Sequence, residues 1–384
     1  LLTGYEMTTD IVVIKTPAAL AKLARKVQHA PAVAVDLEAD SMYHFQEKVC
    51  LIQMATLQSS AVIDPLRLQD LESLRPVFAN PAIEKIFHGA DYDVRSLFRD
   101  FGIEIAHLFD TQIACKFLGV KETSLEAVLQ ARFGVTLNKK YQRKDWSKRP
   151  LPDEMIAYAA DDVRYLLPLT KMLVGELKHK SRLAWVQEEC DLLSRVRSPQ
   201  NNHEPLFLGF KGAGRLKPRS LAVLEALLQF RRRVAENKDR PLFKVFSNKS
   251  LLQLAVEKPA NVKRLDESGV LSSKQLKMYG VELVEAIHRA QQIPSDNLPV
   301  YPRKKNRAMH PAVPDRIKTL KNWRDKKARA LGVEPTVLLN KSMMTALATE
   351  KPIKLQSLDA VKELKEWQKN EFGDEIVGVL KRVR

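Results

Sequence analysis

Short apolar runs alternate with amphipathic stretches over the first ~200 residues, a pattern typical of a domain that mixes strands and helices. The second, third and fourth runs are joined by short connections, so we expect antiparallel pairing among the strands they form. Helices and strands alternate after them, which predicts an α/β fold with a mixed sheet and flanking helices. The apolar runs predict strands at 11–14, 31–38, 49–55, 61–63 and 84–88.

Helices are predicted where apolar residues recur at helical spacing and where start signals precede them. Thr16 followed by Pro17 is such a signal, since Thr caps helices and Pro fits the first helical position. Pro168 should kink the long helix predicted over 153–177, because proline lacks a backbone N–H. Helices are expected over 69–79, 91–101, 111–118, 124–133, 153–177 and 182–194.

The second half of the chain is predicted to hold two helical segments set off by linkers. Residues 198–218 are rich in Ser, Pro, Asn and Gly, and five prolines occur in residues 294–314. The helical segments share landmarks at near-equal spacing, which indicates a duplicated helical bundle. The paired landmarks are Arg231 with Arg324, Pro241 with Pro335, Asn248 with Asn340, and Pro259 with Pro352.

Length and composition fit this organisation. The 384 residues allow two or three domains at about 150 residues each, and we predict boundaries at 8–200, 212–293 and 315–384. No apolar run reaches about 18 residues, and the N-terminus does not resemble a signal peptide, so we expect no membrane span. The three cysteines are far apart, which argues against a disulfide framework or a zinc site and indicates a cytosolic location.

The positive charge is concentrated in one half of the chain. The net charge is +17, and residues 201–384 hold 37 Lys and Arg against 20 Asp and Glu, which accounts for all of it. The first 200 residues hold 26 of each sign. This imbalance indicates a polyanion-binding module joined to a neutral catalytic one, although lysine-rich surfaces also serve solubility.

Two carboxylates lie at the end of a predicted buried strand. Asp36 and Glu38 are two residues apart, so their side chains point to the same face. Carboxylates this close repel each other unless a cation lies between them. By itself the pair fits a solvent-exposed edge strand better than a metal site.

Two further groups of polar residues extend the pattern. Asp93 lies near the start of a predicted helix, where the helix dipole also favours an aspartate. Tyr158 and Asp162 are four residues apart and so point the same way, opposite the apolar stripe of their helix. Each of these two groups alone would also suit a solvent-exposed helix face. Together, four carboxylates and a tyrosine in this order predict a two-metal site that cleaves phosphodiesters.

With these motifs the chain resembles the ribonuclease D family of the DEDD exonuclease superfamily, in the subgroup whose third motif contains a tyrosine. Asp36 and Glu38 match the first motif, Asp93 matches the second, and Tyr158 with Asp162 matches the third. The duplicated helical segments resemble HRDC domains, the second being more divergent. The flanking segments that also match are 49–54, 109–112 and 145–151.

The resemblance implies an RNase H-like fold and a 3′-5′ exoribonuclease that uses two Mg²⁺ or Mn²⁺ ions. Its expected partner is RNA, notably tRNA precursors with 3′ extensions. By the same resemblance, Asp36, Glu38 and Asp162 hold the ion that activates water. Asp36 also helps to hold the second ion, which Asp93 supports. Tyr158 positions the attacking water or helps to deprotonate it, and its ordinary pKa near 10 favours the positioning role.

Two alternatives remain open at this point. A DNA exonuclease of the same superfamily would carry the same ligands, and recognition of the 2′-OH would distinguish it. Two HRDC-like repeats without a helicase motor favour the ribonuclease D family. A non-catalytic RNA-binding protein that kept the fold is the other alternative. The intact set of four carboxylates and a tyrosine argues against it.

The basic residues should hold the RNA backbone. Arg231–Arg233 and Arg303–Lys305 are the clearest clusters, although a solvated surface explains each equally well. Phe210, Phe230 and Trp323 are expected in the cores of the helical bundles, so sequence-specific base reading is not predicted.

Overall fold

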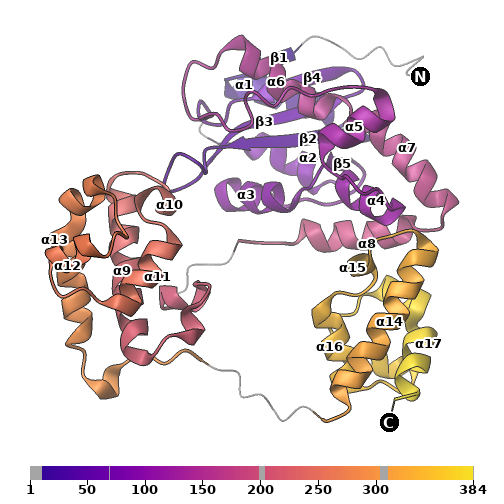
Figure 1. Cartoon of the computed structure of the whole chain (residues 1–384). Coiled ribbons are helices and arrows are strands. Elements are labelled where there is room, and N and C mark those ends of the chain that lie inside the picture. Colours follow the sequence, from indigo (N-terminus) through magenta and orange to yellow (C-terminus); the bar gives the residue numbers. More distant parts are fainter. Residues whose placement is uncertain (1–10, 69, 199–203, 303–309, 384) are drawn as a thin grey trace. The chain divides into compact units, whose positions relative to one another are not determined.

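The computed structural model describes residues 11–68, 70–198, 204–302 and 310–383 (Figure 1). The described residues form two compact units. Unit 1 comprises those within 1–39, 49–198 and 307–384, and unit 2 those within 40–48 and 199–306. No described helix is long and apolar enough to cross a membrane. The predicted domain boundaries at 8–200, 212–293 and 315–384 stay predictions.

Unit 1 is built on a six-stranded mixed sheet, as predicted, with the strand order β1-β4-β3-β2-β5-β6. The β2–β3 and β3–β4 pairs are antiparallel, which confirms the pairing expected from their short connections. The β1–β4, β2–β5 and β5–β6 pairs are parallel. The strands are β1 (Ile11–Ile14), β2 (Ala32–Ala39), β3 (Val49–Thr56), β4 (Ser59–Ile63), β5 (Glu84–Phe87) and β6 (Leu108–Asp110). Among the described strands, only the three-residue β6 was not predicted.

Most helices of unit 1 begin and end where the sequence predicts. The Thr16 side chain accepts a hydrogen bond from the Ala19 amide, which confirms the predicted start of the first helix. The prediction of one helix over 69–79 is wrong in its first half, where a 3₁₀ turn precedes a short helix. Residue 69 lies outside the described residues. The elements are α1 (Pro17–Val27), η1 (Glu72–Leu74), α2 (Arg75–Ala79), α3 (Asp91–Phe101), α4 (Thr111–Leu118), α5 (Leu125–Phe133) and α8 (Leu183–Ser194).

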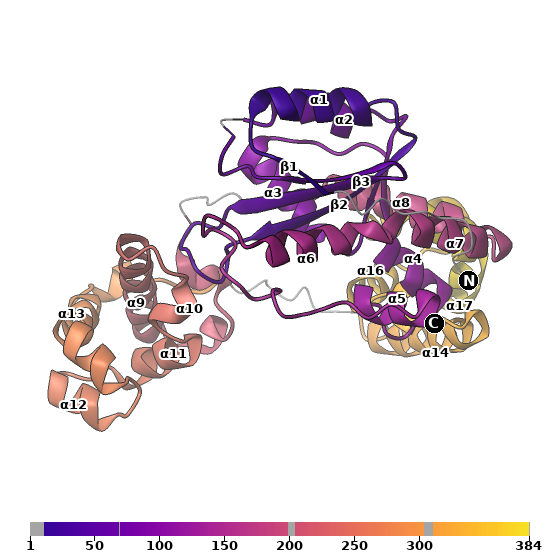
Figure 2. The ribbon, with the colours of Figure 1, turned by 90° about the horizontal axis from the view of Figure 1, so that it is seen from above.

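The long helix expected over 153–177 is two helices, α6 (Asp153–Arg164) and α7 (Leu166–His179). The break falls at Tyr165, three residues before Pro168, which confirms that this proline interrupts the helix. A proline ring clashes with the carbonyl four residues earlier, here that of Arg164, so the regular helix ends there. Pro168 thus sets the end of α6, the helix that carries Tyr158 and Asp162. Figure 2 shows α6 lying along the sheet, where it contacts β2, β3 and β4.

The C-terminal helical bundle also belongs to unit 1 and packs against α8. The Trp185 and Trp367 rings stack with centroids 4.9 Å apart, and the rings of Phe117 and Phe372 meet them edge-on. The bundle comprises α14 (Val313–Leu331), α15 (Pro335–Leu338), α16 (Lys341–Glu350), η5 (Leu355–Ala360) and α17 (Glu366–Lys381).

Unit 2 contains the first helical bundle, together with residues 40–48 that follow β2. Asp239 accepts hydrogen bonds from the Phe45 amide and His44 Nδ1, and Phe45 packs against the apolar core of this bundle. The elements are η2 (Leu206–Gly209), η3 (Ala213–Arg215), α9 (Pro218–Asn237), α10 (Leu242–Val245), α11 (Asn248–Glu257), α12 (Val262–Glu267), α13 (Ser273–Gln291) and η4 (Ser295–Asn297).

One arginine occupies the same place in both bundles, which supports the predicted duplication. Arg231 is buried and donates to the Phe246 carbonyl and to Asn248 Oδ1. Arg324 donates to the Leu339 carbonyl at the equivalent position. The prediction that Arg231 contacts RNA is therefore wrong, because its guanidinium holds two helices of its own bundle together. Phe210 and Phe230 are buried, as predicted, and the 303–305 cluster lies outside the described residues.

Candidate active site

Three carboxylates converge at the carboxyl end of β2. Asp36 and Glu38 point to the face of the sheet that α6 covers, and Asp162 projects from α6 toward them. One oxygen from each of the three lies within 4.8 Å of the others. All three are half-buried, so the group lies inside a cleft rather than on an open edge. The alternative of a solvent-exposed edge strand is wrong, because β2 lies between β3 and β5.

Tyr158 lies on the same side of α6 as Asp162, one turn earlier, and lines the same cleft. Its ring is held by two aromatic neighbours from the preceding loop. The Tyr141 ring meets it edge-on with centroids 5.8 Å apart, and the buried Trp146 ring lies at 6.0 Å with a tilt of 32°. These contacts fix the ring, so the hydroxyl reaches the cleft from a rigid support.

Asp93 is the fourth carboxylate, in the first turn of α3, and only 8% exposed. It lies near enough for its charge to raise the pKa of Glu38, but outside the group of three whose oxygens lie within 4.8 Å. Asp110 sets the position of this turn. Its side chain accepts from the Gly89 and Ala90 amides before α3, and from the Gln112 amide at the start of α4.

The electrostatics of the cluster indicate a binding place for cations. Burial raises the pKa of Asp36 to about 6, and burial with repulsion from Asp36 raises that of Asp162 to about 8. For Glu38, burial and its three acidic neighbours raise the pKa to about 10. Burial, followed by the charge of Asp36, also raises the pKa of Asp93. A divalent cation would remove this repulsion, because it attracts every member of the set.

The donor set also suits the cation. Carboxylate oxygens are the ligands that Mg²⁺ and Mn²⁺ prefer, and no described histidine or cysteine belongs to the group of three. Gln53, the cross-strand neighbour of Asp36, is fully buried, and its amide has no hydrogen-bond partner in the described structure. A buried polar side chain without a protein partner thus lies next to Asp36 in the sheet.

The cleft has a volume of about 370 Å³, and a loop that the sequence did not single out lines its outer wall. Asn138, Lys139 and Gln142 belong to this loop, and Lys139 forms an ion pair with Glu126. The loop is polar and irregular, so no periodic pattern could have marked these residues. His88 also lines the cleft, but its ring nitrogens form hydrogen bonds with Thr111 Oγ1 and the Thr123 carbonyl, so both are used within the fold.

Comparisons with known proteins agree with this geometry. The 3′-5′ exonuclease family matches residues 11–178, and the HRDC domain family matches residues 220–287 and 314–380. Ribonuclease D of Escherichia coli (strain K12) is 32% identical over 297 residues, which are 77% of this chain and 77% of that protein. Ribonuclease D of Acidiphilium cryptum is 32% identical over 306 residues, covering 78% and 77% of the two chains.

A solved structure shows the same arrangement of elements. The crystal structure of Escherichia coli RNase D, described as an exoribonuclease involved in structured RNA processing, superposes with a TM-score of 0.74. The match covers 97% of this chain and 99% of that one, at 27% identity. The similarity therefore extends through both helical bundles.

Proposed function

This chain belongs to the ribonuclease D family and is a 3′-5′ exoribonuclease, and on that premise we propose that it trims tRNA precursors by two-metal hydrolysis. The convergence of Asp36, Glu38 and Asp162 beside Tyr158 is the observation that carries the proposal. Nucleoside 5′-monophosphates would be the products. We further propose a cytosolic location, which the three buried, free cysteines fit.

The DEDD exonucleases are metal-dependent, and the acidic cluster supplies the ligands. Asp36, Glu38 and Asp162 would hold one ion, either Mg²⁺ or Mn²⁺. Asp36 and Asp93 would hold a second, since the charge of Asp36 is near enough to raise the pKa of Asp93 in α3. When bound, such ions activate a water nucleophile and offset the charge that develops on the phosphate.

Tyr158 would position the attacking water rather than deprotonate it. Burial and then the charges of Asp162, Glu38 and Asp36 raise the pKa of its hydroxyl above the ordinary value. The hydroxyl therefore keeps its proton at neutral pH and donates a hydrogen bond. The contacts with Tyr141 and Trp146 restrict the direction in which it donates.

The helical bundles would hold the RNA backbone. Their positive charge supplies contacts to phosphates without sequence preference, and their larger aromatic residues are used in packing. This division assigns chemistry to the sheet domain and much of the affinity to the bundles.

The experiment that tests the proposal incubates the full-length chain with a tRNA carrying extra 3′ nucleotides, with Mg²⁺ or Mn²⁺ and with chelator. Stepwise release of nucleoside 5′-monophosphates that stops in chelator is the expected result. Matched single-stranded DNA in a parallel reaction measures discrimination by the sugar. Cleavage that persists in chelator, or equal rates on the DNA, would contradict the proposal.

A further inference from the structure

A second pocket lies on the same face of the sheet as the catalytic carboxylates. In the strand register Val13 pairs with Val62, Val62 with Gln53, and Gln53 with Asp36, so these four side chains form one row across the sheet. Val13 and Val62 line the second pocket, whereas Asp36 lines the catalytic cleft. The two hollows share no lining residue.

Helix α6 separates the two hollows. Ile156 lines the second pocket, whereas Tyr158, two residues later, lines the cleft. Positions two residues apart on a helix are separated by about 200° around its axis, so these side chains point to opposite sides of α6. A molecule in the second pocket would therefore leave the cleft open to RNA.

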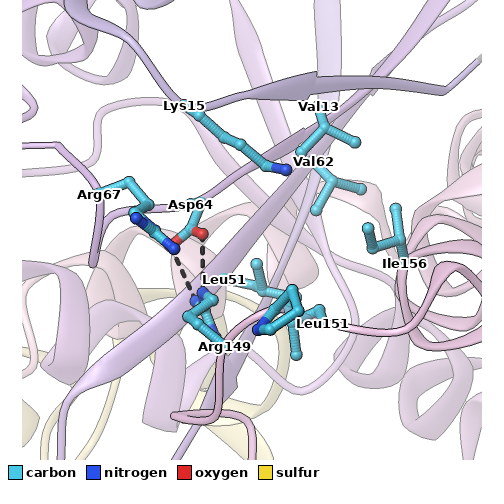
Figure 3. Close-up of a pocket in the computed structure, with 10 residues that line it drawn as sticks. Val13, Lys15, Leu51, Val62, Asp64, Arg67, Arg149, Leu151 and Ile156 are labelled. Atoms are coloured by element: carbon cyan, nitrogen blue, oxygen red, sulfur yellow. Dashed lines mark hydrogen bonds and ion pairs between the residues drawn. The ribbon is translucent and has the colours of Figure 1, made fainter.

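The second pocket combines an apolar floor with a cationic rim (Figure 3). Its volume is about 300 Å³. The Lys15 side chain extends toward Val62, and Arg67 lies beside Asp64. Lys15 and Arg67 follow β1 and β4, so they stand at the carboxyl ends of two parallel strands, where α/β sheets commonly bind ligands. The floor consists of Val13, Leu51, Val62, Leu151 and Ile156.

The charges in this pocket do not cancel. Asp64 is buried and takes two hydrogen bonds from Arg149, at 2.7 and 2.8 Å. The remaining Arg149 donors bind main-chain carbonyls, so this arginine fixes the loop before α6. The side chains of Lys15 and Arg67 are exposed, and neither side chain has a hydrogen bond or ion pair with the described part of the chain. Two positive charges are therefore available to a ligand.

We propose that this pocket binds a nucleotide through its 5′-phosphate monoester. A phosphate monoester carries close to two negative charges at neutral pH, which matches the two available cations. The apolar floor would take the base or the ribose, since small-molecule sites are mostly apolar with a few placed polar groups. Such a monoester occurs on a free nucleoside 5′-monophosphate and on the 5′ end of an RNA. The proposal goes beyond the catalytic reaction and does not depend on the tRNA substrate.

The test measures binding of AMP to the full-length chain by calorimetry in chelator, so that no cleavage contributes. Wild type should bind AMP more tightly than adenosine or inorganic phosphate. The double variant Lys15→Ala/Arg67→Ala should lose at least tenfold in affinity, and Asp162→Asn should lose none. Lys22→Ala removes one exposed cation from α1 outside the pocket and should bind AMP as wild type does.

Competition separates the two sources of the phosphate. Displacement of AMP by a 5′-phosphorylated trinucleotide, but not by its 5′-hydroxyl form, would identify an RNA 5′ end as a ligand. Failure of both trinucleotides to displace AMP would identify the free mononucleotide. Equal displacement by the two trinucleotides, no AMP binding by wild type, or unchanged binding in the double variant would each overturn the proposal.

Discussion

The indole ring of Trp185 in α8 stacks on that of Trp367 in α17, with the ring planes inclined by 21°. Two acidic residues of α8 strengthen this junction. Glu188 accepts hydrogen bonds from the Glu366 and Trp367 amides, and so caps the first turn of α17. Glu189 accepts from Trp367 Nε1 and pairs with Lys365. The second helical bundle is thus part of the folded body that carries the catalytic site.

Loss of the Trp367 ring should destabilise unit 1. Trp367→Ala removes a ring that is 3% exposed and in contact with three other aromatic rings, and substitutions of this kind cost about 3–5 kcal/mol. Urea denaturation followed by tryptophan fluorescence would measure the shift in midpoint. Phe243→Ala, which removes an exposed ring in unit 2, is the control. A midpoint equal to that of wild type would show that the ring stack contributes nothing to folding.

Removal of one catalytic carboxylate should abolish cleavage and yet stabilise the metal-free protein. Asp36→Asn or Asp162→Asn takes away a ligand and also one source of the mutual repulsion that raises the neighbouring pKa values. Rates on a short RNA with Mn²⁺ and melting temperatures in chelator would measure the two effects. Asp161→Asn changes an exposed neighbour paired with Arg164 and should stay active. Full activity in Asp36→Asn would exclude the proposed site.

The Tyr158 hydroxyl should matter to turnover and not to metal affinity. Tyr158→Phe keeps the packing with Tyr141 and Trp146 and removes only the donor, so we expect a fall of roughly 10²-fold or more in kcat. Tyr165→Phe, whose ring packs against Phe133, should keep normal turnover. Manganese titration would show near-equal affinities for both variants and wild type. Weakened manganese binding with normal turnover per bound ion would instead make Tyr158 a support of the metal site.

The sequence predicted the elements that follow from local patterns. The alternation in β2 correctly placed Asp36 and Glu38 on one face, and helical spacing placed Tyr158 beside Asp162. The sequence did not predict the contacts that a residue makes with partners far away along the chain. Arg231 resembles a surface cation in the sequence, but its partners are Phe246 and Asn248, which only tertiary packing brings to it. Lys15 and Arg67 likewise line one pocket only because β1 pairs with β4, a contact between strands some 50 residues apart.

A buried lysine should make stability depend on pH. Lys85 is fully buried, donates to the Asn80 and Ile83 carbonyls, and has its pKa lowered by burial to about 8. Between pH 8 and about 10.4 the unfolded chain binds the proton and the folded chain does not, so folding becomes more favourable as pH rises. The melting temperature of wild type relative to Lys85→Met should therefore increase from pH 7 to 10. For the exposed control Lys22→Met, the difference in melting temperature from wild type should not change over this pH range. If the melting temperature of wild type relative to Lys85→Met fell as the pH rose, the lowered pKa of Lys85 would be refuted.

RNA affinity should depend on cations of unit 2 more than on those of the sheet domain. Truncation is a poor test, since the helical bundle of residues 310–383 packs within unit 1 and its removal would uncover Trp185. A triple variant of exposed lysines in unit 2, Lys249→Gln/Lys263→Gln/Lys274→Gln, avoids this problem. Its matched control, Lys22→Gln/Lys26→Gln/Lys121→Gln, removes the same charge from exposed positions of the first 200 residues.

For each phosphate contact that is lost, RNA binding releases one fewer counterion. The slope of log affinity against log salt should therefore become shallower by about 0.7–0.9 per contact. We expect a change of up to about 2 for the unit 2 variant and little for its control, on one tRNA substrate in chelator. The rate on a trinucleotide, which offers few phosphates to bind, should stay normal in both variants because the carboxylate cluster is untouched. Equal slopes and affinities in the two variants would assign the positive charge of unit 2 to a partner other than RNA.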